Sequence, residues 1–160
     1  MTTALPIFRT DGEGEKRWFL GGGTHTWKAT AEETGGSFLL FEDRMSGGKM
    51  TPLHCHPDAD EMLYILEGEI LVRIGDREER VGAGGVTMAP RGVPHAFMVI
   101  SEVARLLDFQ TPGSSEPFYW SASEPAVADT EGPVDFTRVQ AMAKQHGAVE
   151  ILGPPPFEPV

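Results

Sequence analysis

The apolar residues of this chain come in short runs that glycine and proline interrupt. The runs are rich in apolar and β-branched residues, and no helical spacing extends over a useful length before residue 130. This pattern predicts strands at 37–44, 61–70, 69–76, 85–90, 95–100 and 104–111. Gly75 and Asp76 are placed to turn one hairpin, and a polar edge strand follows them. Many short strands at regular spacing indicate an all-β sandwich or barrel, which we expect over about residues 15–112.

The last third of the chain has a different pattern. Residues 112–134 are rich in proline, serine and acidic residues, and they indicate a loop along the surface. A helix is predicted near 135–146, because an aspartate stands at its N-cap and a glycine follows its end. Residues 149–160 are expected to form an extended arm. The aromatic cluster at 117–120 could cover the mouth of the barrel or attach the tail to it. All of this fits one domain over residues 1–160.

Composition and charge narrow the possible partners. The formal net charge of −11 argues against a nucleic-acid backbone or an anionic membrane, because both repel such a surface. The single cysteine cannot form an internal disulfide, which fits a reducing compartment. The first residues show no basic start followed by an apolar core, and the longest strongly apolar runs, about five residues, are far shorter than a membrane span. We therefore expect a cytoplasmic protein.

Two of the five histidines lie one residue apart and are followed by a glutamate. Because side chains alternate across a strand, His54 and His56 point to one face and Cys55 points to the other. Glu61 opens a mostly apolar face, and a lone buried carboxylate needs a partner. A third histidine, His95, follows a turn rich in proline and glycine. These four polar residues could simply lie on loops, but three imidazoles and a carboxylate also suit one divalent transition metal: iron, manganese, nickel, cobalt, copper or zinc.

The remaining polar residues near these segments have plainer explanations. His25 and His146 are expected to be structural or exposed, since His146 suits the C-terminal end of a helix. Asp58 and Asp60 lie between the candidate ligands and indicate a solvated loop. Tyr64 points to the face opposite the glutamate, so we leave it out of the site.

The spacing of the candidate ligands resembles the two sequence motifs of the cupin family. The first motif is present as Gly48, His54, His56, Glu61 and Gly68. The second motif is present as Gly84, Pro90, Gly92 and His95. Its final asparagine is replaced by Val99, which removes a polar group from near the site and leaves the ligands intact. The likeness extends over nearly the whole chain and is strongest to small bacterial proteins described as quercetin-dioxygenase-like.

This resemblance implies a jelly-roll barrel, or double-stranded β-helix, with a short C-terminal helix and one bound metal ion. It also implies a dioxygenase that acts on a flavonol-like or other aromatic, enolisable small molecule. In that scheme Glu61 takes the proton of the hydroxyl group that binds the metal. Because the core of such a barrel is also its pocket, we expect substrate contacts from Leu63, Ile65, Phe97 and Val99. Small cupins commonly pair, so we expect a homodimer.

Two other functions use the same four ligands. A metal-dependent isomerase, cyclase or lyase would act through an enolate and consume no O2. A non-catalytic cupin would hold a small molecule for sensing or storage. Oxygen consumption separates a dioxygenase from the other enzymes, and turnover of a substrate separates all of these enzymes from a binding protein.

Overall fold

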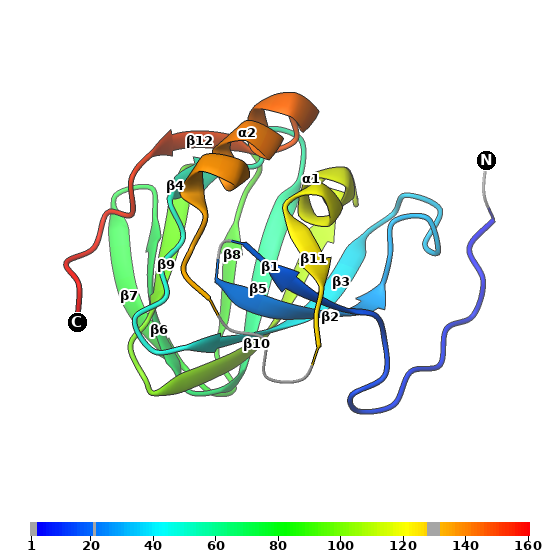
Figure 1. Ribbon diagram of the computed structural model, residues 1–160, viewed down its shortest axis with the longest axis horizontal. Helices are drawn as coiled ribbons and strands as arrows, with labels where there is room; N and C mark the ends of the chain where they lie inside the picture. Colours follow the sequence, from blue (N-terminus) through cyan, green and yellow to red (C-terminus); the bar gives the residue numbers. More distant parts are fainter. Residues whose placement is uncertain (1–2, 21, 128–131) are drawn as a thin grey trace.

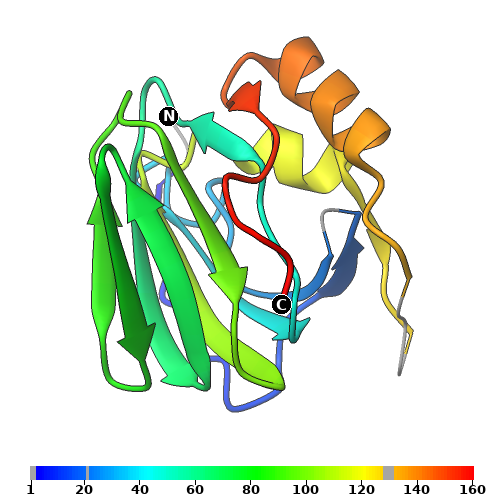
Figure 2. The same cartoon turned by 90° about the vertical axis from the view of Figure 1, so that its left-hand side faces the viewer.

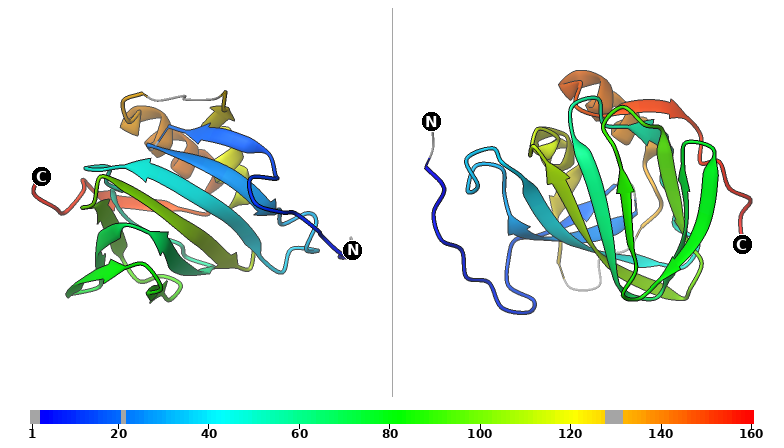
Figure 3. Two further views of the ribbon diagram at one scale, coloured as in Figure 1. Left: turned by 90° about the horizontal axis from the view of Figure 1, so that it is seen from below. Right: turned by 180° about the vertical axis from the view of Figure 1, so that it is seen from behind.

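The computed structural model describes residues 3–20, 22–127 and 132–160, and it shows two antiparallel sheets that face each other (Figure 1). The larger sheet has the strand order β11-β1-β2-β3-β10-β5-β8, and the smaller sheet has the order β12-β4-β9-β6-β7. The strands are β1 Lys16–Phe19, β2 Gly23–Ala29, β3 Leu39–Ser46, β4 Leu53–Cys55, β5 Asp60–Glu67, β6 Glu69–Ile74, β7 Arg77–Gly82, β8 Val86–Ala89, β9 His95–Val99, β10 Val103–Thr111, β11 Ser123–Pro125 and β12 Glu150–Gly153. The predicted jelly-roll barrel is confirmed, and Figure 3 shows its sheets from two further sides.

The predicted strands are present because their side chains alternate between the interior and the surface. In β10 every second residue is buried, and in β5 the buried positions are Glu61, Leu63 and Ile65. The motif glycine Gly68 joins β5 to β6 at a φ of +80°, where a Cβ would collide with the carbonyl oxygen of Val103. Only glycine fits this close approach. The next turn lies between β6 and the polar edge strand β7, as predicted.

The segment predicted as a surface loop at 112–134 is structured in part. It contains the helix α1 Glu116–Ser121 and the strand β11, which pairs with β1. The prediction was wrong because a proline in the first turn of α1 suits a helix start, and because β11 gains its hydrogen bonds from a strand about 100 residues earlier in the chain. Part of the predicted loop, residues 128–131, lies outside the described residues.

The second helix and the C-terminal residues close one end of the barrel. The helix α2 Phe136–His146 begins after Asp135, whose side chain accepts a hydrogen bond from the Arg138 backbone, and it ends at Gly147. Both caps agree with the predicted helix. The expected extended arm contains β12, which pairs with β4. Figure 2 shows α2 and β12 together at the same end of the molecule. Within the described parts of the chain, no helix is long and apolar enough to cross a membrane.

Two clusters of buried side chains fill the interior. One lies between the sheets and comprises Met45, Leu63, Ile65, Ile70, Val72, Phe97, Val99, Ala104 and Leu106. The other joins β2 and β3 to the helices and comprises Trp27, Leu39, Phe41, Phe118, Tyr119, Ala122, Val139, Ala143 and Val149. The aromatic cluster of the tail is thus part of the core, because Phe118 and Tyr119 are buried. The candidate ligands lie near the junction of these two clusters.

Candidate metal centre

The four predicted ligands meet inside the barrel, although they come from both sheets. His54 lies in β4 and His95 begins β9, and these two residues are direct partners across the smaller sheet. His56 follows β4, and Glu61 reaches the same place from β5 of the larger sheet. All four side chains are buried, and one possible ligand atom from each lies within 4.8 Å of all the others. The structure therefore brings together the residues that the spacing of the motifs selected.

Each histidine is oriented by a hydrogen bond at the nitrogen that faces away from the cluster. The Nδ1 atoms of His54 and His95 lie 2.8 and 2.9 Å from the carbonyl oxygens of Pro52 and Val93. The Nδ1 atom of His56 lies 3.2 Å from the hydroxyl oxygen of Ser115. A proton on Nδ1 leaves the lone pair of Nε2 free to bind a metal ion, which is the usual arrangement around metal-ligating histidines.

The carboxylate of Glu61 lies at the centre of the cluster. Its oxygens lie 3.2 Å from His56 Nε2 and 3.1 Å from His95 Nε2. Burial alone would raise the pKa of Glu61, but its contacts with His56 and His95 outweigh burial and hold this pKa well below its usual value. For His95, burial lowers the pKa because it disfavours the charged imidazolium. The hydrogen bond to Glu61 outweighs burial, so the pKa of His95 is raised.

The pKa of His54 is lowered to about 3, first by burial and then by the neighbouring His95 and His56. His54 is therefore neutral near pH 7, and a neutral imidazole is the form that binds a metal ion.

Glu61 has a further partner that the sequence did not indicate. Gln110 Nε2 lies 2.8 Å from Glu61 Oε2, 3.0 Å from Asp108 Oδ1 and 2.7 Å from the Tyr119 hydroxyl. Burial and the nearby Glu61 raise the pKa of Asp108 well above its usual value, and burial and Asp108 do the same for Tyr119. Asp108 and Gln110 are inward residues of β10, so alternation could have placed them inside, but nothing in the sequence indicated that they reach the glutamate.

The cluster fits a divalent transition metal. His56 Nε2 is buried, and apart from its 3.2 Å contact with the Glu61 carboxylate it has no hydrogen-bond partner among the described residues, although buried polar nitrogens are normally satisfied. The three Nδ1 contacts leave the three Nε2 atoms free to bind a metal ion, and those of His56 and His95 face the Glu61 carboxylate. Imidazole and carboxylate together suit iron, manganese, cobalt, nickel, copper and zinc. His54, His56, Glu61 and His95 would hold the ion.

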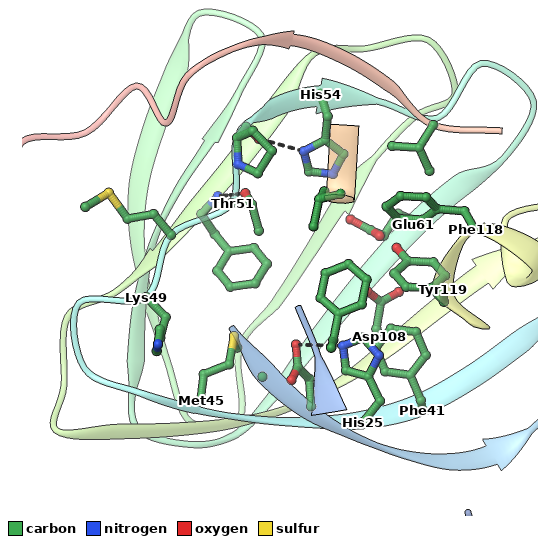
Figure 4. Close-up of a pocket in the computed structure, with 18 of the residues that line it drawn as sticks. His25, Phe41, Met45, Lys49, Thr51, His54, Glu61, Asp108, Phe118 and Tyr119 are labelled. Carbon is green, nitrogen blue, oxygen red and sulfur yellow. Dashed lines mark hydrogen bonds and ion pairs between the residues drawn. The ribbon is translucent and has the colours of Figure 1, made fainter. Parts of the chain in front are cut away.

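A cavity of about 650 Å³, including the part that is open to solvent, adjoins this cluster. Figure 4 shows His54 and Glu61 on one side of it, with aromatic side chains around them. Of the four predicted substrate contacts, Phe97 lines the cavity. Leu63, Ile65 and Val99 pack in the core cluster between the sheets instead, because the barrel interior divides into a packed part and an open part. Whether a substrate contacts any of the four stays a prediction.

Several other residues also line the cavity. His25, expected to be structural or exposed, is buried on the cavity wall beside Asp43. Tyr119 and Phe118 of the tail line it as well, so the aromatic cluster of the tail forms part of the wall. No motif in the sequence indicated His25, because its position depends on how β2 pairs with β3.

The remaining polar residues lie away from the cluster, as expected. Cys55 lies 3.8 Å from a carboxylate oxygen of Glu150, and its side chain is not part of the cavity wall. Asp60 makes an ion pair with Arg91 at 3.0 Å near the surface. Tyr64 is exposed on the outer face of the larger sheet.

Comparison with known proteins agrees with this description. Residues 41–109 match the family described as "Cupin domain". Quercetin 2,3-dioxygenase of Bacillus subtilis is 29% identical over 117 residues, which are 72% of this chain and 34% of that protein. The chain thus spans about a third of the length of this curated relative.

Solved structures share the fold. KdgF from Halomonas sp. superposes with a TM-score of 0.61 at 17% identity, covering 68% of this chain and 94% of that one. An RmlC-like cupin from Shewanella frigidimarina gives 0.60 at 19% identity, covering 70% and 95%. A predicted oxalate decarboxylase from Thermotoga maritima gives 0.59 at 19% identity, covering 68% and 99%. Fold, ligand cluster and family match agree, and residues 41–109 form a cupin domain.

Proposed function

We propose that the protein is a metal-dependent dioxygenase that acts on a flavonol-like or other aromatic, enolisable small molecule. The observation that carries this proposal is the buried cluster of three histidines and a glutamate beside a largely apolar cavity with phenylalanine and tyrosine side chains in its wall. The likeness to a bacterial quercetin 2,3-dioxygenase supports the choice of substrate class.

The metal would supply a Lewis acid that binds a substrate oxygen and makes the attached hydroxyl more acidic. The protein residues then have two tasks. Glu61 lines the cavity, so its carboxylate is placed to accept the proton that the substrate hydroxyl loses. Gln110 donates a hydrogen bond to the same carboxylate and keeps it oriented.

The cavity walls have a separate role. Phe41, Phe97 and Phe118 offer flat apolar surfaces to an aromatic ring. A ring held between such side chains displaces water from the neighbourhood of Glu61, which strengthens the electrostatic interactions there. The walls therefore select an aromatic substrate, while the ligand cluster orients its oxygens.

The test is purification without added metal or chelating resin, followed by metal analysis and oxygen uptake with a panel of flavonols. We expect one transition-metal ion per chain and O2 consumption equal to flavonol loss. His95→Ala is the matched control and should show neither. Flavonol loss without O2 uptake would favour the isomerase, cyclase or lyase, and binding without any turnover would favour a binding protein.

A further inference from the structure

A second polar pair lies on the cavity wall away from the metal cluster. His25 of β2 and Asp43 of β3 are direct cross-strand partners, and both line the cavity. Their exposed fractions are only 2% and 7%. Figure 4 shows His25 on the opposite side of the cavity from His54. A ligand that fills the cavity would therefore meet polar groups at both ends.

The surrounding residues hold this pair in a fixed orientation. The ring of His25 is stacked between Phe19 and Phe41, at centroid distances of 4.8 and 4.1 Å. The carboxylate of Asp43 occupies the space beside Gly23 where a Cβ atom would otherwise lie. Packing on both sides leaves neither side chain free to turn, so the pair keeps one arrangement on the cavity wall.

Two polar atoms of the pair are left without partners. His25 Nε2 lies 3.6 Å from Asp43 Oδ2, slightly beyond hydrogen-bonding distance. His25 Nδ1 and Asp43 Oδ1 have no hydrogen-bond partner among the described residues. A buried polar atom without a partner destabilises the folded protein. Two such atoms at the wall of an open cavity indicate that a ligand completes them.

The chemistry of these atoms narrows the ligand group. A carboxylate oxygen can only accept, so the ligand must supply an O–H or N–H group. The cavity also contains the carboxyl groups of Glu61 and Asp108, which disfavour a second anion there. The ammonium group of Lys49, which also lines the cavity, already donates to the carbonyl oxygen of Gly132 at 3.1 Å. A neutral hydroxyl group satisfies these conditions better than a carboxylate or a phosphate.

Resting on the proposed function, we propose that His25 and Asp43 recognise a phenolic hydroxyl group at the end of the substrate remote from the metal cluster. The substrate is then a flat aromatic molecule with oxygen at both ends. One end faces His54 and Glu61, and the other donates a hydrogen bond to the His25–Asp43 pair. Tyr119 lies on the wall between the two ends, and Phe41 lies beside His25 at the remote end.

The experiment compares three flavonols by calorimetric titration of the metal-loaded protein without oxygen, so that binding is measured apart from turnover. The probes are 3-hydroxyflavone, which lacks a remote hydroxyl group, and its 3,7- and 3,4′-dihydroxy relatives. We expect at least one of the two relatives to bind about tenfold more tightly than 3-hydroxyflavone, as one hydrogen bond to a charged acceptor allows.

The variants are His25→Phe, which keeps the stacked ring, and Asp43→Leu, which keeps a similar size. Each should abolish the preference for the dihydroxyflavone and leave the affinity for 3-hydroxyflavone, the metal content and the melting temperature near their wild-type values. The control is Arg44→Gln, an exposed neighbour of Asp43 on β3, which should keep the full preference.

Three outcomes would overturn the inference: equal binding of the three flavonols by the wild type, an unchanged preference in both variants, or an equal loss of affinity for all three. The last would assign the pair a purely structural role. If oxygen uptake with flavonols is normal in these cases, the proposed function stands and only this inference falls. If the metal-loaded wild type binds none of the flavonols, the substrate class and this inference fall together.

Discussion

Ser115→Ala is a small change that tests whether the hydrogen bond behind His56 supports metal binding. Ser115 is fully buried, and its hydroxyl oxygen lies 3.2 Å from His56 Nδ1. It stands at the N-cap of α1, but its side chain makes no capping hydrogen bond. The substitution therefore removes a partner of His56 without removing a helix cap, and alanine fits the same space.

The expected loss follows from these contacts. The ring of His56 is only 1% exposed, so water cannot easily replace the lost hydroxyl group. Removing a residue that orients a metal ligand typically weakens metal affinity by about 10- to 100-fold, or about 1.4–2.7 kcal/mol. We expect Ser115→Ala to raise the dissociation constant by about tenfold, the lower end, because a neutral hydroxyl rather than a carboxylate is lost.

The assay is a competition titration of the metal-free protein with zinc or cobalt in the presence of a chromophoric chelator. Ser114→Ala is the matched control, because the neighbouring Ser114 is exposed. It should bind the metal as the wild type does. If Ser115→Ala binds the metal as tightly as Ser114→Ala does, the hydroxyl group of Ser115 does not help His56 to bind the metal. The role assigned to the hydrogen bond between Ser115 and His56 would then be wrong.

Three further predictions follow from other contacts. Glu61→Gln should still bind a metal ion through the three imidazoles, though more weakly, and should lose turnover. Metal analysis together with oxygen uptake checks this. If the variant refilled with metal turns over normally, Glu61 is only a metal ligand. Phe41→Ala should lower the free energy of unfolding by about 3–5 kcal/mol in urea titrations, because its side chain is buried; a loss below about 1 kcal/mol would contradict this. The hydrogen bond from Arg9 lowers the pKa of Glu33 to about 2. Because the pair is partly exposed, it should stabilise the fold by less than about 1 kcal/mol above pH 4.5. This contribution should be lost as the pH falls toward 2. Glu33→Gln should therefore differ from the wild type at pH 7 but not near pH 2, and equal unfolding curves at pH 7 would refute it.

The ligand cluster could be predicted because it depends on local rules. Alternation along β4 and β5 puts His54, His56 and Glu61 inside, and the turn before β9 aims His95 at the same place. The motif spacing then identified the four residues as a set. The expected homodimer and cytoplasmic location stay predictions.

The cavity walls could not be predicted, because they depend on contacts between distant segments. His25 reaches the cavity only through the pairing of β2 with β3, and Tyr119 reaches it through a short helix inside a segment with loop-like composition. Ser115, at the N-cap of the same helix, reaches His56. A six-residue helix is too short to show a period in the sequence. The alternation of side chains along the strand correctly predicted that Val99 is buried. It could not predict that Val99 packs in the core cluster and does not line the cavity.

The direct pairing of His54 with His95 also links the metal to the yield of correctly folded protein. The strand β4 has three residues, and this is its one position paired with β9. The residues before β4 continue the pairing with β9, with Met50 opposite Met98 and a hydrogen bond from the Thr51 backbone to the Phe97 carbonyl oxygen. A slip of the two strands by one residue would turn the imidazole of His54 to the outer surface. Because a metal ion binds only the form in which the ligands converge, it stabilises that form by mass action. Cells grown with ample transition metal should therefore accumulate more of the correctly registered barrel than cells starved of it.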